Sequence, residues 1–256
     1  MKVLAITQAR IGSSRLPGKV LLPLGAGSLL DLQLARLSRA QLPDRLLVAT
    51  TREAGSEQIC AIAAAHGCDC YQGSLDDVLD RFYQAAKPYA PDWVVRLTSD
   101  CPLLDPVLVD AVIAAAIAGG YDYYTNTFVE HYPDGQDVEV FRFGALERAW
   151  QEARLPSERE HVTPYLRKHS DYLGGSLFTA ANHAAPADYG GLRMTVDEPA
   201  DLAVMRWLVE ALGVDADWQT YADYMLQQRE SLSNAGIARN EGYQKSVNQD
   251  NETPTI

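Results

Sequence analysis

Basic and small residues suited to a polyphosphate follow the first apolar run of the chain, between Gln8 and Lys19. The cations could neutralise phosphate charge, the serines could donate hydrogen bonds, and the glycines allow close backbone approach. In chain order these residues are Arg10, Gly12, Ser13, Ser14, Arg15, Gly18 and Lys19. The segment therefore predicts a phosphate-binding loop, and the alternative is a solvated basic loop in which glycine and proline only form turns.

The spacing in this loop excludes two familiar phosphate-binding motifs. A P-loop has the pattern G-x-x-x-x-G-K-[ST], whereas here five residues separate Gly12 from Gly18, and Val20 follows Lys19. The dinucleotide fingerprint G-x-G-x-x-G is also absent. A phosphate loop at this place must therefore be of another kind.

Two aspartates stand where a parallel sheet would bind a metal ion. Asp100 closely follows the apolar run 93–98, and Asp197 directly follows the run 192–196. Ligands of open α/β sheets bind beyond the carboxyl ends of the strands, and Mg²⁺ favours one or two carboxylates together with substrate phosphates. Asp100 and Asp197 are therefore candidate magnesium ligands. The alternatives are a turn residue at Asp100 and a helix N-cap before Pro199 at Asp197.

Further polar residues flank the neighbouring segments. Ser74, Asp77 and Arg81 follow the run 69–72 and should lie at the edge of the predicted phosphate site. Ser74 and Asp77 would equally suit the start of a helix, where a side-chain oxygen accepts backbone hydrogen bonds.

Five polar residues of the second half are further candidates for binding a ligand. Asp137 and Glu139 would share one face of a strand, where they could bond sugar hydroxyls or line a solvated edge. His161 could contact a sugar carboxylate or transfer a proton, or it could be an ordinary helix-surface histidine. Arg159 and Glu160 precede it in the same helical segment. No Ser-His-Asp or Cys-His arrangement can be assembled from the sequence.

Alternating strand and helix patterns must position these residues. Short β-branched or aliphatic runs alternate with longer helical patterns, which predicts an α/β fold with a parallel sheet and helices on both faces. The pairs are 2–8 and 28–39, 45–50 and 56–66, 69–72 and 75–86, and 92–98 and 106–118. Asp105 with Pro106 predicts the start of the last of these helices, and Gly119-Gly120 predicts its end.

The regular alternation of strand and helix patterns ends after about residue 120. Strands are predicted at 122–126 and 137–143, and a strand-like run at 192–196 precedes a helix at 199–212. The segment 240–256 is rich in Asn, Gln, Glu and Lys and has too little apolar content to order itself. We therefore expect one domain over residues 1–239, followed by a flexible C-terminal tail.

Composition limits the location and the partners of the chain. It has 256 residues, of which 47% are hydrophobic, enough for one sizeable core. A formal net charge of −12 disfavours a nucleic acid partner, because phosphate backbones bind clusters of Lys and Arg. No run resembles a signal peptide or a membrane span, so a cytoplasmic location without a membrane partner is expected. The four cysteines show no zinc-site spacing and are expected to be reduced packing residues, namely Cys60, Cys68, Cys70 and Cys101.

Several of these segments resemble one protein family. Gln8-Ala9-Arg10 with residues 12–21 looks like the signature loop of the cytidylyltransferases that make CMP-activated sugar acids, such as acylneuraminate and KDO cytidylyltransferases. Within them it is most similar to the SpsF-type branch, named for spore-coat polysaccharide biosynthesis. The similarity continues through residues 73–82, 96–103, 137–141, 159–165, 193–197 and 240–243, so it covers nearly the whole chain in order.

The resemblance implies a fold, a reaction and a set of site residues. The fold would be the three-layer, Rossmann-like fold of nucleotide-diphospho-sugar transferases, with a small extension for acceptor binding and dimerisation. The enzyme would transfer CMP from CTP to a sugar or sugar acid and release pyrophosphate, in surface polysaccharide or glycan biosynthesis. Asp100 and Asp197 would ligate Mg²⁺, and Arg10, Arg15 and Lys19 would neutralise the triphosphate. The nucleotide-binding set would be Gln8, Ala9, Arg10, Gly12, Ser13, Ser14, Arg15, Lys19, Gly73, Ser74, Asp77, Arg81, Thr98, Ser99 and Asp100.

In this interpretation residues 1–120 bind the nucleotide, and residues 121–239 bind the acceptor and a second copy in a homodimer. A sugar hydroxyl attacks the α-phosphorus, with Arg10, Lys19 and Asp100 as catalytic residues. The general base stays open between Asp100, a metal-bound hydroxide and a sugar carboxylate. Two other functions also stay open: a nucleotide-sugar-dependent glycosyltransferase that uses Asp215-Ala216-Asp217, and a catalytically silent nucleotide-binding protein.

Overall fold

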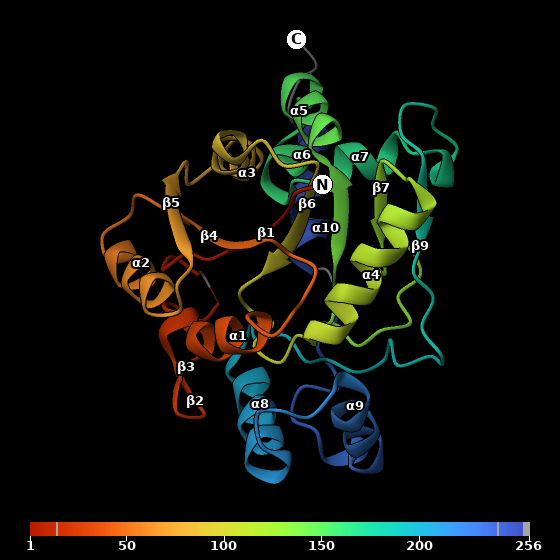
Figure 1. The fold of residues 1–256 in the computed structure, drawn as a ribbon. Coiled ribbons are helices and arrows are strands. Elements are labelled where there is room, and N and C mark those ends of the chain that lie inside the picture. The colour runs from red at the N-terminus through yellow and green to blue at the C-terminus, as the bar shows by residue number, and fades with distance from the viewer. Residues whose placement is uncertain (14, 240, 253–256) are drawn as a thin grey trace.

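A central sheet positions the rest of the molecule. A computed structural model describes residues 1–13, 15–239 and 241–252 (Figure 1). Its strands are β1 (Val3–Gln8), β2 (Pro23–Leu24), β3 (Gly27–Ser28), β4 (Arg45–Thr51), β5 (Asp69–Gly73), β6 (Trp93–Thr98), β7 (Tyr123–Thr125), β8 (Glu139–Arg142) and β9 (Ala180–Asn182). Seven of them form one sheet in the order β5-β4-β1-β6-β8-β7-β9, and β2 pairs with β3 separately. The four neighbouring strands β5, β4, β1 and β6 are parallel, and β8 runs antiparallel to β6 and β7.

Helices cover both faces of this sheet, as the sequence predicts. They are α1 (Leu29–Leu37), α2 (Ser56–Ala65), α3 (Val78–Ala86), α4 (Pro106–Gly119), α5 (Phe143–Glu152), α6 (Pro156–His161), α7 (Pro164–Lys168), α8 (Pro199–Leu212), α9 (Trp218–Gln227) and α10 (Glu241–Glu252). Short 3₁₀ helices lie at Lys19–Leu21, Lys87–Tyr89, Asp171–Leu173 and Arg229–Ser231. In the described part of the chain, no helix has both the length and the apolarity needed to cross a membrane.

The first strand shows why three layers form. Val3 and Ala5 pack in an apolar cluster with α4, whereas Leu4 and Ile6 pack in another with α3 and α5. Successive side chains of a strand point to opposite faces, so an uninterrupted apolar run supplies both layers at once. The predicted mostly parallel, three-layer fold is therefore confirmed.

The expected strand at 192–196 is absent, and this prediction is wrong. Its residues make only an isolated bridge, from Arg193 to Asp134. Met194 and Val196 are apolar because they are buried against α8 and α9, which lie side by side below α1 in Figure 1. The backbone N–H of Met194 donates to the carbonyl oxygen of Asp134, and that of Val196 donates to Asp100 at 2.8 Å. Tertiary burial, not sheet pairing, explains the apolar pattern.

Residues 241–252 also differ from the predicted flexible tail, because they form α10, which packs against α6; the last four residues of the predicted tail lie outside the described residues. Polar contacts replace the apolar ones that its composition lacks. The Asp250 carboxylate accepts hydrogen bonds from the backbone N–H of Ser157 at 2.9 Å and from its hydroxyl at 2.5 Å. Composition alone shows too few apolar residues for a core, but it does not show hydrogen-bond partners supplied by another helix.

The prediction that all four cysteines are reduced is wrong for two of them. Cys60 of α2 and Cys70 of β5 form a disulfide, with their Cα atoms 5.4 Å apart. The turn at Gly67 folds the chain back, so that the middle of α2 faces β5. Cys68 and Cys101 are free. Sequence spacing does not reveal such a pairing, because it depends on how the helix and the strand turn.

Asp105 connects two helices and generates a stability prediction. Its carboxylate accepts from the backbone N–H of Val107 at the start of α4, at 2.8 Å, and from that of Trp218 at the start of α9, also at 2.8 Å. Asp105→Ala should lower the free energy of unfolding in urea by about 2 kcal/mol, because it leaves part-buried donors at the start of two helices unpaired. Asp217→Ala, which removes the exposed cap of α9, is the matched control and should cost about 1 kcal/mol. An equal loss in both variants would contradict the connecting role of Asp105.

Candidate active site

One large cavity lies at the carboxyl ends of β1 and β6, where ligands of open α/β sheets bind. Its volume is about 920 Å³, and its lining includes Gln8 and Thr98 at the two strand ends and residues of α6, α7 and α10. Nine of the 22 lysines and arginines of the chain line it: Arg10, Arg15, Lys19, Arg96, Arg159, Arg167, Arg193, Arg239 and Lys245. In a chain of net charge −12, this concentration of cations favours an anionic ligand.

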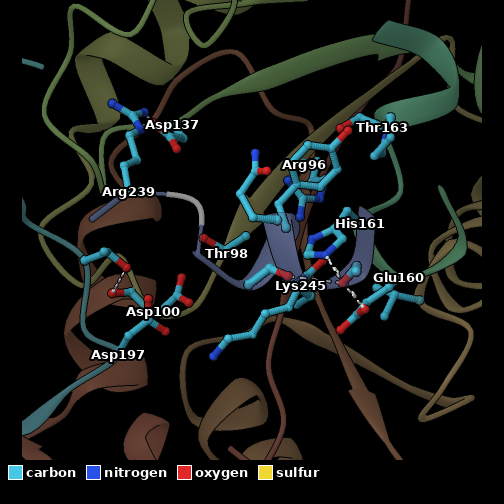
Figure 2. Close-up of a pocket in the computed structure, with 18 of the residues that line it drawn as sticks. Arg96, Thr98, Asp100, Asp137, Glu160, His161, Thr163, Asp197, Arg239 and Lys245 are labelled. Carbon is cyan, nitrogen blue, oxygen red and sulfur yellow. Dashed lines mark hydrogen bonds and ion pairs between the residues drawn. The ribbon is translucent and has the colours of Figure 1, made fainter. Parts of the chain in front are cut away.

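The ammonium group of Lys19 joins the two predicted metal ligands. Lys19 Nζ donates to Asp100 Oδ2 at 2.9 Å, to Asp197 Oδ1 at 2.8 Å and to the carbonyl oxygen of Val196 at 2.9 Å. Figure 2 shows Asp100 and Asp197 together at one side of the pocket. The fold thus brings together two aspartates that stand far apart in the sequence.

Mutual stabilisation of these charges shifts their pKa values. Burial alone would raise the pKa of Asp100, but the Lys19 ammonium and a hydrogen bond from Thr98 outweigh it, and this pKa lies well below its usual value. Burial would lower the pKa of Lys19, but the charges of Asp100 and Asp197 raise it above its usual value. Asp100 and Lys19 are therefore both charged at neutral pH.

Arg193 fixes Asp197, although the segment that carries it is not a strand. Its guanidinium group donates to Asp197 at 2.9 Å, to Asp201 at 2.9 Å and to Asp134 at 2.7 Å. The loop that carries Asp134 comes very close to this segment at Gly135, where φ is +105° and a Cβ would lie 2.5 Å from the backbone of Met194. Glycine is needed at this position for both reasons.

Glu139, a predicted acceptor ligand, lies in the cavity lining but is occupied by the protein itself. It is 5% exposed, and it accepts hydrogen bonds from Tyr123 at 2.5 Å, from Thr163 at 2.7 Å and from Arg96. Burial would raise the pKa of Glu139, but Arg96 and these hydrogen bonds lower it. Glu139 therefore orients Arg96 and Thr163 toward the cavity.

The other predicted acceptor residues also line the cavity. Asp137, just before β8, accepts from Arg239 at 2.6 Å. His161 and Glu160 both bond the hydroxyl of Ser246, at 3.0 and 2.6 Å. Burial, together with the nearby charge of Arg96, lowers the pKa of His161, which favours the neutral imidazole. Figure 2 shows His161 and Glu160 across the pocket from Asp100 and Asp197.

The residues expected near the nucleoside lie behind the cavity wall. Asp77 caps α3, and its second oxygen accepts from Arg159 Nε at 3.0 Å. Arg81 donates to the carbonyl oxygen of Ser74 at 2.7 Å, and burial lowers the pKa of Arg81 to about 10. A Cβ at Gly73 would lie 2.9 Å from the Arg81 side chain. Asp77 thus contributes indirectly, because it holds Arg159, a predicted acceptor residue that lines the cavity.

The remaining loop predictions divide into lining and supporting residues. The lining includes Gln8, Arg10, Ser13, Arg15 and Thr98. Gln8 Oε1 is buried without a hydrogen-bond partner in the described structure. Ala9 is buried, the backbone of Ser99 donates to Gln8, and Gly12 lies close to Glu53. Ser14 lies outside the described residues.

Sequence reasoning missed five cavity cations: Arg96, Arg167, Arg193, Arg239 and Lys245. Arg96 gives a signal, because it is a charged residue inside the otherwise apolar strand β6. Arg167, Arg239 and Lys245 follow no motif, and their place in the cavity depends on how α7 and the C-terminal segment fold back.

Comparison with known proteins identifies the family. A family model described as cytidylyltransferase matches residues 4–203. The chain belongs to the cytidylyltransferase family. This confirms the predicted family and the predicted nucleotidyltransferase that transfers CMP.

Two individual relatives and one solved structure are similar to this cytidylyltransferase over most of its length. The spore coat polysaccharide biosynthesis protein SpsF of Bacillus subtilis is 32% identical over 84% of this chain and 89% of its own. An uncharacterised protein of Methanocaldococcus jannaschii is 38% identical over 78% of this chain and 80% of its own. The solved structure of a cytidylyltransferase from Leptospira borgpetersenii is 30% identical, with a TM-score of 0.86 over 93% of this chain and all of that one.

The Lys19 contacts predict a large loss of activity on substitution. Lys19→Met should reduce turnover roughly 10²-fold or more, the scale of lost electrostatic stabilisation of a transition state. The measurement is pyrophosphate release at saturating CTP. Lys168→Met is the matched control, because Lys168 is exposed and pairs only loosely with Glu158, at 3.9 Å. Unchanged turnover in Lys19→Met would remove Lys19 from the active site.

Proposed function

We propose that this cytidylyltransferase transfers CMP from CTP to a hydroxyl group of a sugar acid, for the synthesis of a surface polysaccharide. The observation that carries the proposal is a single cavity with two chemically different ends. One end holds the Lys19, Asp100 and Asp197 cluster beside the basic loop, and the other holds His161 and Glu160. The name of the Bacillus subtilis relative supports the polysaccharide pathway.

In this proposal the basic loop, which is the segment between Gln8 and Lys19, binds the triphosphate. Arg10 is exposed at the cavity, and Arg15 lies 3.0 Å from Asp197. Both cations can therefore reach phosphate oxygens beside the Lys19 cluster. The unpaired amide oxygen of Gln8 is available to a donor group of the nucleotide.

Asp100 and Asp197 would hold Mg²⁺. The two carboxylates already converge on one cation, the Lys19 ammonium, and oxygen ligands are those that Mg²⁺ favours. No set of three or more His, Cys, Asp or Glu side chains suited to a metal occurs among the described residues, so phosphates and water would complete the coordination. When bound, Mg²⁺ would neutralise phosphate charge and orient the phosphates.

The acceptor hydroxyl oxygen would attack the α-phosphorus in line. The bond from the α-phosphorus to its bridging oxygen breaks, pyrophosphate leaves with the electron pair, and the hydroxyl proton passes to solvent water. Lys19 and the arginines of the loop stabilise the charge that develops on pyrophosphate. On the acceptor side, His161 and Thr163 offer hydrogen bonds to the sugar, while Glu139 and Asp137 hold Arg96 and Arg239.

Residues 1–120 supply most of the proposed nucleotide site, and residues 121–239 supply most of the acceptor site, with Asp197 as the exception. The homodimer and the cytoplasmic location stay predictions. The glycosyltransferase alternative has no support at the cavity: Asp215 pairs with Arg39 on the surface and Asp217 caps α9.

Asp100 and Asp197 should act as one unit. Asp100→Asn and Asp197→Asn should each abolish Mg²⁺-dependent turnover, and the double variant should lose little more than either single one. Asp215→Asn is the control and should keep full activity, because this side chain is exposed and outside the cavity. Losses that multiply in the double variant would show two independent sites.

A pyrophosphate-release screen tests the function itself. Each of the four common nucleoside triphosphates is combined with neutral sugars and sugar acids in the presence of Mg²⁺. We expect pyrophosphate with CTP and a sugar acid, together with a product that contains CMP. Preference for another nucleotide, or for a neutral sugar, would contradict the corresponding part of the proposal.

A further inference from the structure

The C-terminal helix α10 forms part of the cavity wall. Five consecutive residues of the chain, from Gly242 to Ser246, line the cavity. Ser246 is buried, and its hydroxyl contacts both Glu160 and His161, while the ring of Tyr243 meets His161 edge-on with centroids 5.3 Å apart. The helix is thus docked against the predicted acceptor residues, at the end of the cavity away from Asp100 and Asp197.

Most of the cations at the end of the cavity near His161 and Glu160, the proposed acceptor side, are already paired with carboxylates of the chain. Arg96 pairs with Glu139, Arg159 with Asp77, and Arg239 with Asp137. A paired guanidinium group has less capacity to bind a further anion, because its charge is largely compensated.

Two cavity cations of this side lack a carboxylate partner in the described structure. Arg167 donates to the hydroxyl of Thr127 at 2.7 Å and lies over the ring of Phe128, both of which are neutral. Lys245 is exposed and makes no hydrogen bond or ion pair with the described residues. Figure 2 shows its side chain extending from α10 into the pocket, between His161 and the aspartate pair. Its charge is therefore available to a bound anion.

We infer that Lys245 binds the carboxylate of the sugar acid and thereby selects acidic over neutral acceptors. This inference rests on the proposed function. In the proposed function the triphosphate lies at the other end of the cavity, beside Arg10, Arg15 and Lys19. Lys245 projects between the two ends of the cavity from the helix whose Ser246 contacts Glu160 and His161, so its ammonium group can reach an acceptor bound there (Figure 2). A flexible, unpaired ammonium group suits a carboxylate whose exact position varies between acceptors.

The test compares a charged acceptor with its neutral analogue. Full-length wild type and Lys245→Met are assayed by pyrophosphate release with CTP and a panel that includes 3-deoxy-manno-octulosonate and N-acetylneuraminate. The best acceptor and its methyl ester then give separate kcat/KM values. Lys245→Met should lose about tenfold or more with the acid, the scale of a lost hydrogen bond between charged groups, and less than about twofold with the ester. The KM for CTP should not change.

Two further variants isolate the charge from the fold. Lys245→Arg should keep most of the preference for the acid, because it keeps the positive charge. Lys168→Met, on α7 and outside the cavity lining, should behave as wild type.

Equal losses with acid and ester would show a structural effect and overturn the inference. A raised KM for CTP would assign Lys245 to the triphosphate and overturn it as well. If the wild type accepts no sugar acid at all, the proposed function fails first, and the inference fails with it.

Discussion

The shared ammonium group of Lys19 is the interaction on which the active site depends. It holds together two aspartates from distant parts of the chain, each within 2.9 Å of the same nitrogen. Two carboxylates this close repel one another in a partly buried place, so they require a cation between them. Lys19 can supply it because Gly18, with φ of +67°, leads into the 3₁₀ helix whose Val20 is buried in the core.

Arg193 extends this arrangement to two segments without regular structure and to the start of α8. The aspartates that it holds belong to the 132–135 loop, to the chain before α8 and to α8 itself. Such buried pairs gain little net stability, because each charge loses its hydration, but removing one partner leaves a buried charge uncompensated. We infer that their role is to fix geometry: they place Asp197 without a strand, as β6 places Asp100.

Secondary-structure elements that depend only on neighbouring residues were predicted correctly from the sequence. The apolar runs of β1 and β6, and the Asp105-Pro106 start of α4, follow from rules that involve neighbouring residues only. The convergence of Asp100 and Asp197 followed from placing both at one edge of a sheet, although the segment before Asp197 is not a strand. In that case burial against α8 produced a strand-like pattern by another route.

Features that depend on distant contacts escaped prediction for a common physical reason. The Cys60–Cys70 pair depends on the angle at which α2 returns to β5, and composition does not encode this angle. α10 is held by Ser157 and Glu160 through hydrogen bonds, so hydrophobicity gives no sign of it. Lys245 reaches the cavity only because that helix docks.

The two ends of the cavity are built from different kinds of structure, and this difference explains how one reaction could serve different acceptors. The nucleotide end uses the ends of β1 and β6, which are central strands packed on both faces and therefore rigid. The proposed acceptor end uses the short helices α6 and α7 and the docked helix α10, which is held on α6 by hydrogen bonds that are individually weak in net terms. Changes in these helices leave the sheet intact, so they can alter the acceptor without disturbing the Lys19 cluster. In the proposed function, α6, α7 and α10 would therefore determine which sugar acid is accepted, whereas the phosphate loop would determine the reaction type.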